Sequence, residues 1–495
     1  MRYTWAMTTE ACTDARLRTL VDRPERTDAD FVLYWMIGER RPSHNFALQH
    51  AVHRANALGK PLVVLEPLDC TYEWACDRFH AFIIQGMAEN QALFADSAAT
   101  YYPYVEPAPA KGQGLLAALA DRACVIMTDD RPGYRFPGLL SRAAHHVKTR
   151  FIAVDGAGVL PLTTAPKVYK RAVDFRRYVH KAFSHEAPVR PIPEPLRGLS
   201  RQTGPDLSAI LAEWPEADLS ALRATGGLAA LPIDHSIPAV ADRPGGPATA
   251  ATRLERFLDQ KLERYPERNH PDKDVASGLS PWLHFGHVGG AQVAWAVLDA
   301  SGWQRENMDA SRFSKQEGAW GLSAGAESFL EEVITWRELS AQTAWAHPDD
   351  HHRYIGLPQW ARTTLAEHRD DPREHLYDLE TLADGKTEDP LWNAAQRQLR
   401  ESGIMHNYLR MLWGKRVLAW TESPEACFAA LVELNNRYAL DGRDPNSYGG
   451  IAWVMGRYDR AWGPERPIYG KIRYMTSQST RRKLKLSGWL ERWTD

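Results

Sequence analysis

The side chains best suited to chemistry lie in the last third of this 495-residue chain. Arg410 precedes Trp413 by one helical turn in the segment 405–420, on a face that is otherwise mostly apolar. A guanidinium group on such a face needs a carboxylate partner, and Asp441 in the acidic turn DGRDPN is the candidate. The pair could orient a ligand or simply tie two elements together, and spacing alone does not separate these alternatives.

Two further segments combine groups that could bind a ligand. Glu332 and Trp336 are four residues apart, which places a carboxylate and an indole on one helical face. The sequence SGLSP (277–281) puts two hydroxyls and a glycine before a helix that could begin at Pro281. Hydroxyls and backbone N–H groups at such a position suit a phosphate, although Ser280 is also an ordinary N-cap residue.

Positive charge gathers at the carboxyl-terminal end. Residues 471–495 hold seven Lys or Arg and two acids, a net charge of +5, whereas the whole chain has a net charge of −2. A basic cluster flanked by Tyr469, Tyr474 and Trp489 is typical of nucleic-acid contact, with a solvated tail as the alternative.

Tryptophan is unusually frequent and unevenly placed. Fourteen of the 18 tryptophans lie at or after Trp282. Indoles filling a large helical core would explain most of them.

The elements that must position these groups follow from periodicity. Between residues 30 and 156, five apolar runs alternate with helical patterns, which predicts a doubly wound parallel sheet; the runs are 31–36, 61–68, 99–105, 124–128 and 151–154. Neither a GxGxxG nor a Walker sequence follows any of these runs. Four prolines in 187–195 indicate an extended linker, and helical spacing dominates from about residue 252. We therefore predict an α/β domain (28–185), a Pro/Gly-rich connector (186–250) and a larger all-α domain (251–495).

Composition excludes several classes of protein. The hydrophobic and charged fractions, 44% and 25%, are those of an ordinary globular protein. Five scattered cysteines (Cys12, Cys70, Cys76, Cys124 and Cys427) form no CxxC pair, so neither a disulfide framework nor a metal site is predicted. No apolar run is long enough for a membrane span, and the first residues lack a secretory h-region. We expect a cytoplasmic, prokaryotic-like monomer, without an obligate protein partner, that reaches the nucleoid through DNA.

Several motifs in this order resemble one family. SGLSPWLHFG (277–286), the segment 332–339, the segment 405–413, DGRDPN (441–446) and ERPIYGKIRYM (465–475) together resemble the class II cyclobutane pyrimidine dimer photolyases of the photolyase/cryptochrome superfamily. The resemblance spans residues 28–485. It implies an N-terminal α/β domain, a C-terminal helical domain that binds FAD, and light-driven electron transfer to a pyrimidine dimer flipped out of DNA, which is carbon–carbon lyase chemistry.

The resemblance also implies the residues around FAD. Tyr265, Arg268, Ser277, Gly278, Leu279 and Ser280 would line its pyrophosphate and ribityl side. Arg410 and Asp441 would form an ion pair beside the isoalloxazine, with Asp444 close by and Asn446 facing N5. The α/β domain could hold a second, antenna chromophore such as a deazaflavin or a folate, or none, and the sequence does not choose among these.

The same resemblance assigns the DNA-binding and electron-transfer residues. Glu332 would hydrogen-bond the dimer carbonyls, Trp336 and Trp462 would stack on the flipped bases, and Met411 would pack against them. Lys471, Arg473, Arg481 and Arg482 would contact DNA. Trp413, Trp392 and Trp420 would pass electrons from the surface, with Tyr377 nearby.

Two segments depart from the family pattern. SAQTAW (340–345) stands where the family has an Asn-Phe pair and further aromatics, and Tyr458 stands where it commonly has histidine. The alternatives are a flavin photoreceptor of the same fold, a repair enzyme for (6-4) lesions, and a nucleic-acid-binding module without a cofactor.

Overall fold

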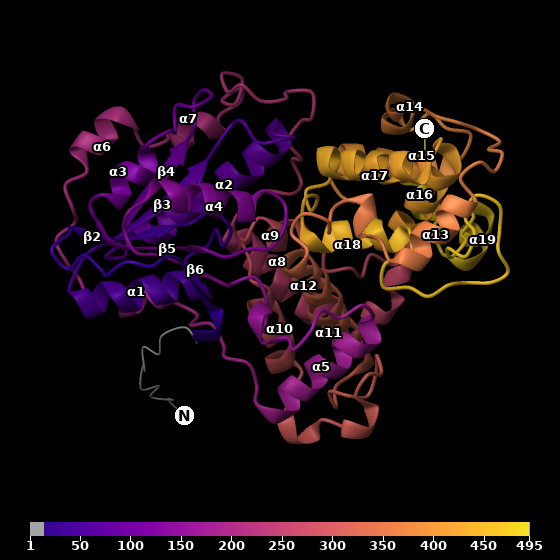
Figure 1. Ribbon diagram of the computed structural model, residues 1–495, viewed down its shortest axis with the longest axis horizontal. Coiled ribbons are helices and arrows are strands. Elements are labelled where there is room, and N and C mark those ends of the chain that lie inside the picture. The colour runs from indigo at the N-terminus through magenta and orange to yellow at the C-terminus, as the bar shows by residue number, and fades with distance from the viewer. Residues whose placement is uncertain (1–13, 495) are drawn as a thin grey trace.

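Six strands form one sheet in the amino-terminal part of the computed structural model, which describes residues 14–494 (Figure 1). The strands are β1 (Leu17–Val21), β2 (Phe31–Trp35), β3 (Leu62–Leu68), β4 (Thr100–Val105), β5 (Ala123–Asp129) and β6 (Phe151–Val154), in the order β1-β6-β5-β2-β3-β4. All neighbours are parallel except β1, which pairs antiparallel with β6. Strands β2 to β6 confirm the five strands that the apolar runs predict. Edge strand β1 was not predicted because none of its residues is fully buried.

Helices cover both faces of this sheet. Val32 and Tyr34 face α1 (Phe46–Leu58) and α2 (Asp77–Ala95), whereas Leu33 and Trp35 lie in the core formed with α3 (Leu115–Ala120) and α4 (Phe136–His146). The alternation follows from the strand period of two. The predicted doubly wound α/β architecture is thus confirmed.

Helix α5 (Ala172–His185) joins the helical half rather than the sheet. Its His180 and Phe183 pack against Trp320 with ring centroids 5.2 and 4.8 Å apart. The sequence places residues 172–185 in the α/β domain, but in the structure they pack against the segment η8 (Glu331–Trp336) and against Trp295 of α10 (Gly290–Ala300). The connector then runs mostly without regular structure through the short helices α6 (Ser208–Glu213) and α7 (Leu219–Arg223).

The carboxyl-terminal half is helical, as predicted. Its helices are α8 (Pro247–Gln260), α9 (Ser280–His284), α10 (Gly290–Ala300), α11 (Ala324–Leu330), α12 (Arg337–Ala346), α13 (Gln359–Glu367), α14 (Leu379–Asp384), α15 (Pro390–Ser402), α16 (Asn407–Trp420), α17 (Pro424–Tyr438), α18 (Pro445–Val454), α19 (Ser477–Lys483) and α20 (Ser487–Trp493). A 3-10 segment, η4 (Leu262–Asn269), follows α8, and a π-helical turn, η8 (Glu331–Trp336), joins α11 to α12. The helical spacing of residues 327–343 in the sequence does not reveal this change in hydrogen-bond pattern.

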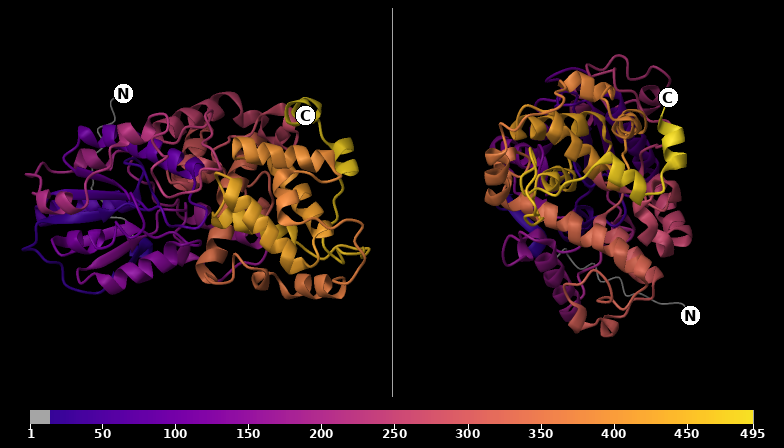
Figure 2. Two further views of the ribbon diagram at one scale, coloured as in Figure 1. Left: turned by 90° about the horizontal axis from the view of Figure 1, so that it is seen from above. Right: turned by 90° about the vertical axis from the view of Figure 1, so that its right-hand side faces the viewer.

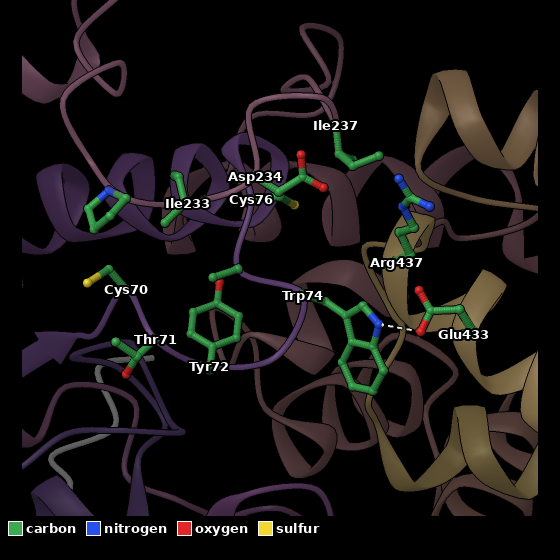
Figure 3. A pocket seen from close by; sticks show the side chains of 12 residues that line it. Cys70, Thr71, Tyr72, Trp74, Cys76, Ile233, Asp234, Ile237, Glu433 and Arg437 are labelled. Atoms are coloured by element: carbon green, nitrogen blue, oxygen red, sulfur yellow. Dashed lines mark hydrogen bonds between the residues drawn. The ribbon is translucent and has the colours of Figure 1, made fainter. Parts of the chain in front are cut away.

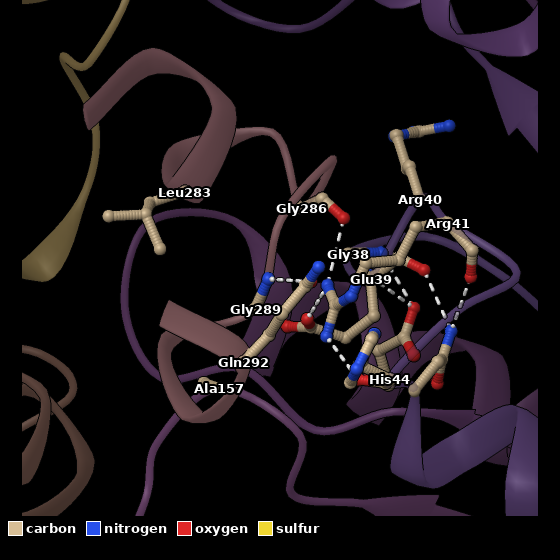
Figure 4. Close-up of polar contacts among 12 residues, drawn as sticks. Gly38, Glu39, Arg40, Arg41, His44, Ala157, Leu283, Gly286, Gly289 and Gln292 are labelled. Carbon is tan, nitrogen blue, oxygen red and sulfur yellow. Dashed lines mark hydrogen bonds and ion pairs between the residues drawn. The ribbon is translucent and has the colours of Figure 1, made fainter. Parts of the chain in front are cut away.

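Buried arginines connect the two halves, which lie side by side in Figure 2. Arg41, which follows β2, donates to the carbonyls of Gly286 (2.8 Å) and His44 (3.0 Å) and pairs with Glu39 (Figure 4). The backbones approach so closely that a Cβ on Gly286, whose φ is +76°, would lie 1.8 Å from the Gly38 carbonyl oxygen. This junction fixes the end of the sheet against the helical half.

Candidate functional site

The predicted Arg410–Asp441 ion pair is present. Nη2 of Arg410, in the first turn of α16, lies 2.6 Å from Oδ1 of Asp441, in the turn between α17 and α18. Asn446 is the second residue of α18, and its backbone N–H donates to the N-cap Asp444 at 2.9 Å. Its side chain remains exposed. The structure therefore brings Arg410, Asp441, Asp444 and Asn446 to neighbouring helix ends, and Met411 lies half-buried beside Arg410.

Asp444 stays ionised although it is enclosed. Burial alone raises the pKa of Asp444, but a hydrogen bond with His284 and the charges of Arg337 and Arg131 outweigh it, so the pKa lies well below its ordinary value. The contacts are 3.4 Å to His284 Nδ1 and 3.9 Å to Arg131 Nη2. Burial lowers the pKa of His284 to about 4, so this histidine is neutral near pH 7.

The hydroxyl-rich turn 277–280 faces a guanidinium group that the sequence did not single out. A Cβ on Gly278, whose φ is +65°, would lie 3.0 Å from Nη1 of Arg253 on α8. Arg253 stacks on Trp282 at 4.6 Å, and its buried Nε has no hydrogen-bond partner within residues 14–494. A cation beside Ser277 and Ser280 has the donor chemistry that a diphosphate needs. Only the fold brings Arg253 here, from 24 residues upstream of Ser277.

Arg268 contacts the side chain of Glu332. Its Nη2 is 2.9 Å from Oε1 of Glu332, its Nη1 donates to Ser328 Oγ at 2.7 Å, and its guanidinium group stacks over buried Tyr265 at 4.8 Å. Burial raises the pKa of Glu332 despite the opposing charge and hydrogen bond of Arg268. Arg268 thus partners the expected catalytic carboxyl group directly.

Trp336 stacks on a tryptophan that the sequence analysis did not name. The ring centroids of Trp336 and Trp453 are 5.0 Å apart, with an interplanar angle of 26°. Both side chains are half-buried, on η8 and α18 respectively. The sequence contains one signal for Trp453: it follows Asn446 by seven residues and therefore shares its helix face.

Trp462, the expected partner of Trp336, lies in the loop after α18. Two guanidinium groups stack on its ring, Arg460 at 4.4 Å and Arg473 at 4.3 Å. Asp459 accepts hydrogen bonds from Trp462 Nε1 at 3.1 Å and Arg473 Nε at 3.1 Å. Trp462 thus belongs to a cationic and aromatic unit with Arg460 and Arg473.

The two departures from the family pattern meet. The hydroxyls of Thr343 and Tyr458 are 2.7 Å apart. A Cβ on Gly449 would lie 2.2 Å from Ser340 Oγ, so α12 and α18 approach closely beside the stacked tryptophans.

The predicted tryptophan series is contiguous. Trp413 and Trp392 are nearly parallel, with centroids 6.3 Å apart, and Trp392 meets Trp420 edge-on at 5.3 Å. Trp420 meets Tyr377 at 5.4 Å, so the series ends in a half-buried phenol ring. Trp392 Nε1 donates to the Trp413 carbonyl at 2.9 Å, which fixes the first two rings.

The basic carboxyl-terminal residues are largely exposed. Arg481 and Arg482 lie in the last turn of α19, and Lys471 Nζ pairs with Glu465 at 2.9 Å. Arg473 is half-buried through its contact with Asp459 and Trp462.

A cavity of about 410 Å³ lies between the loop after β3, the connector and α17 (Figure 3). Tyr72, Trp74, Cys70 and Cys76 line one side, and Trp74 Nε1 donates to Glu433 at 2.8 Å. Within residues 14–494 no group of three or more His, Cys, Asp or Glu could hold a metal ion. No helix of that same part is long and apolar enough to cross a membrane. Cys12 lies outside the described residues; the other four cysteines are buried and free.

Comparison with known proteins gives a consistent result. A deoxyribodipyrimidine photo-lyase of Methanothermobacter thermautotrophicus is 31% identical over 485 residues, covering 96% of this chain and 97% of that protein. One from Oryza sativa subsp. japonica is 32% identical over 483 residues, covering 93% of this chain and 86% of its own. No protein-family model matches.

Solved structures share the fold. A class III photolyase from Agrobacterium tumefaciens superposes with a TM-score of 0.67 at 17% identity, covering 94% of this chain and 86% of that one. An archaeal photolyase from Sulfolobus tokodaii, solved with two FAD molecules, superposes with a TM-score of 0.65 at 12% identity. The match covers 94% of this chain and 90% of that one.

Proposed function

The chain belongs to the deoxyribodipyrimidine photo-lyase family, and from this premise we propose that it repairs cyclobutane pyrimidine dimers in DNA with light, as a class II type enzyme. One observation supports this most strongly. The π-helical turn η8 carries both Glu332, whose pKa is raised, and Trp336, which stacks on Trp453. The turn thereby combines a carboxyl group of raised pKa with an aromatic surface for bases.

FAD would lie between the turn 277–280 and the ends of α16 and α18. Its diphosphate would be held by Arg253 and the turn residues Ser277, Gly278, Leu279 and Ser280, with Tyr265 nearby. The unpartnered Nε of Arg253 and the exposed amide of Asn446 fit such a ligand. Arg410, Asp441, Asp444 and Asn446 would orient the ring system. Bound FAD supplies the light-excited electron.

Glu332 and Arg268 would act on the lesion itself. Burial raises the pKa of Glu332, which favours the protonated form that can donate to a pyrimidine carbonyl oxygen. Arg268, 2.9 Å from Glu332, places a positive charge where negative charge develops on the dimer. Both groups are fixed before substrate arrives, Arg268 by Ser328 and Glu332 by the π-helical turn.

Aromatic side chains would receive the flipped bases. Stacking on Trp336 and Trp453 offers a sequence-independent surface, since every base has a π-face. Met411 would pack against the same bases. Trp462, held between Arg460 and Arg473, would contact DNA beside the lesion.

Basic side chains would bind the DNA backbone. Arg473, Lys471, Arg481 and Arg482 lie on the segments that follow α18. Each phosphate contact removed should reduce the slope of log affinity against log salt by about 0.9. Changing Arg481 and Arg482 to glutamine tests this, with the exposed Arg171→Gln as a matched control.

Electrons would enter through the tryptophan series. The ring centroids of Trp413 and Trp392 are 6.3 Å apart, and those of Trp392 and Trp420 are 5.3 Å apart. The three rings therefore form a path toward half-buried Tyr377. Trp295 and Trp303 pack against Phe183 instead and have no such task.

The cavity of about 410 Å³ would hold the second chromophore that the resemblance implies. It lies at the carboxyl end of β3, where ligands bind in doubly wound sheets, and aromatic side chains line it. Reconstitution with a deazaflavin or a folate, in wild type and Trp74→Ala, would identify the ligand by its absorption band.

Binding in the dark distinguishes the alternatives. The purified chain should carry flavin absorbance and bind an oligonucleotide with one thymine dimer more tightly than the undamaged oligonucleotide. Absence of flavin after reconstitution would indicate a cofactor-free binding module. Equal affinity for both DNAs would favour a photoreceptor, and preference for a (6-4) lesion would change the substrate.

We further propose that the chain acts as a monomer in the cytoplasm, on DNA and without an obligate protein partner. Light scattering of the protein, alone and bound to DNA, measures whether it is a monomer.

A further inference from the structure

We propose that helix α5 and the loop after β6 position the lesion-binding turn, through Glu331 and Glu338 acting as positioning residues for Glu332 and Trp336. This inference rests on the proposed function, since it concerns how the dimer site is held. Neither Glu331 nor Glu338 is among the groups assigned to substrate or cofactor above. Both are almost fully buried, with 6% and 3% of their surface exposed.

Glu331 fixes the first residue of the π-helical turn. Its Oε2 accepts from Nε of Arg176 on α5 at 2.8 Å, and its Oε1 pairs with Nη2 of the same guanidinium group. Arg176 also donates from Nη1 to the Ser314 carbonyl at 2.8 Å. This two-pronged contact sets both the distance and the rotation of the turn relative to α5.

Glu338 and Arg337 fix the other end of the turn. Glu338 accepts from the backbone N–H groups of Val159 and, at 3.3 Å, Leu160, whereas Arg337 Nη1 donates to the Ala157 carbonyl at 2.7 Å. The partners lie in one loop (155–162) that directly follows β6. Trp336 directly precedes Arg337 and Glu338 in the chain.

The loop 155–162 is itself held firmly to the sheet. Arg16 donates to the carbonyls of Asp155, Gly158 and Val159 at 3.0, 3.3 and 2.7 Å. Asp155 accepts from the N–H groups of Leu162 at 2.7 Å and Ala157 at 3.3 Å. The loop therefore holds the end of the π-helical turn at a fixed position relative to β6.

A π-helical turn needs such support. The form is rare and has poorer intrinsic geometry than an α-helix, so surrounding contacts must maintain it. Relaxation to an α-helix would shift the register by one residue, which is about 100° of rotation. Glu332 and Trp336 would then no longer face Arg268 and Trp453 together. The two anchors oppose that change from both ends.

Three substitutions test the proposal away from the site itself. Glu331→Gln weakens the contact with Arg176, and Glu338→Gln replaces one acceptor oxygen with a donor that opposes the loop amides. Gly158→Ala introduces a Cβ 3.2 Å from Glu338 Cδ, at a position whose φ is not positive. Matched controls are Asp174→Asn, which weakens an exposed arginine pair on the same helix α5, and Gly138→Ala at an exposed position of α4.

The readouts are flavin content, melting temperature, and affinity in the dark for dimer-containing and undamaged oligonucleotides. We expect each anchor variant to keep its flavin and to lose about tenfold in the ratio of the two affinities, while the controls keep the ratio. An unchanged ratio, with or without a lower melting temperature, would show that the anchors only stabilise the fold. If Glu338→Gln does not fold, Gly158→Ala and Glu331→Gln decide the question. Wild type that shows no dimer preference would overturn the proposed function instead.

Discussion

Trp336 and Trp453 stack with ring centroids 5.0 Å apart, although 117 residues separate them in the chain. We expect Trp453→Ala to weaken binding of dimer-containing DNA as much as Trp336→Ala does, by about 1–3 kcal/mol, because each ring supplies half of the base-stacking surface. The double variant should lose less than the sum, since either change alone breaks the pair. Fluorescence anisotropy in the dark measures all three affinities. If Trp336→Ala loses affinity for the dimer-containing DNA but Trp453→Ala does not, Trp462 rather than Trp453 would be the second residue that stacks on the bases.

Glu332→Gln should slow repair by about tenfold, corresponding to about 1.4 kcal/mol of lost stabilisation at the dimer carbonyls. FAD should remain bound, because Glu332 contacts Arg268 and not the turn 277–280. The measurement is repair per absorbed photon by chemically reduced enzyme, with flavin absorbance recorded on the same sample. A colourless variant would mean that Glu332 supports the cofactor rather than the lesion.

Trp413→Phe should block light-driven reduction of the flavin yet leave repair by chemically reduced enzyme intact. Trp413 begins the ring series through Trp392, and phenylalanine is much harder to oxidise than indole. Trp303→Phe is the matched control, because Trp303 packs in the core against Phe183. Illumination with an external reductant, followed by absorbance, separates the two variants. Normal photoreduction in Trp413→Phe would contradict the proposed path.

The stability of the anchor around Glu338 should depend on pH. Burial raises the pKa of Glu338 to about 7, although the Val159 and Leu160 amides, Arg337 and Arg16 oppose the rise. Tyr178 also faces this group. A carboxyl group with a raised folded-state pKa stabilises the fold at low pH and loses that contribution as pH increases from about 4.5 to about 7.

Wild type should therefore lose up to about 3 kcal/mol of unfolding free energy relative to Glu338→Gln between pH 5 and pH 8. Asp155, whose pKa burial raises to about 6, is present in both proteins and cancels in the comparison. Denaturant titrations at several pH values give the difference directly. Parallel curves for the two proteins would show that Glu338 has an ordinary pKa.

The sheet was predictable because buried parallel strands appear as continuous apolar runs, as in FIAV at 151–154. The Arg410–Asp441 pair was predictable because a guanidinium group on an apolar helix face demands a carboxylate. The π-helical turn was not, because Glu331–Trp336 has the same apolar spacing that a regular helix would have. Arg253 and Trp453 were missed because their neighbours, Gly278 and Trp336, are distant in sequence.

The contact of Arg268 with Glu332 was not predicted. The resemblance assigned Arg268 to the cofactor and contained no sign that the 3-10 segment η4 turns its side chain toward Glu332 and Ser328. Likewise, α5 follows the α/β part in sequence but packs through Arg176 and Phe183 on the helical half. Tertiary contacts decide both cases, and local pattern contains no information about them.

Illumination of the reduced, flavin-loaded protein with an oligonucleotide containing a single thymine dimer tests the central claim most directly. Chromatography of the oligonucleotide before and after blue or near-UV light measures conversion of the dimer to two thymines. We expect conversion that requires light, exceeds one turnover per protein, and falls in Glu332→Gln while Asp174→Asn behaves as wild type. An unchanged dimer after illumination of protein that holds reduced flavin and binds the lesion would contradict it.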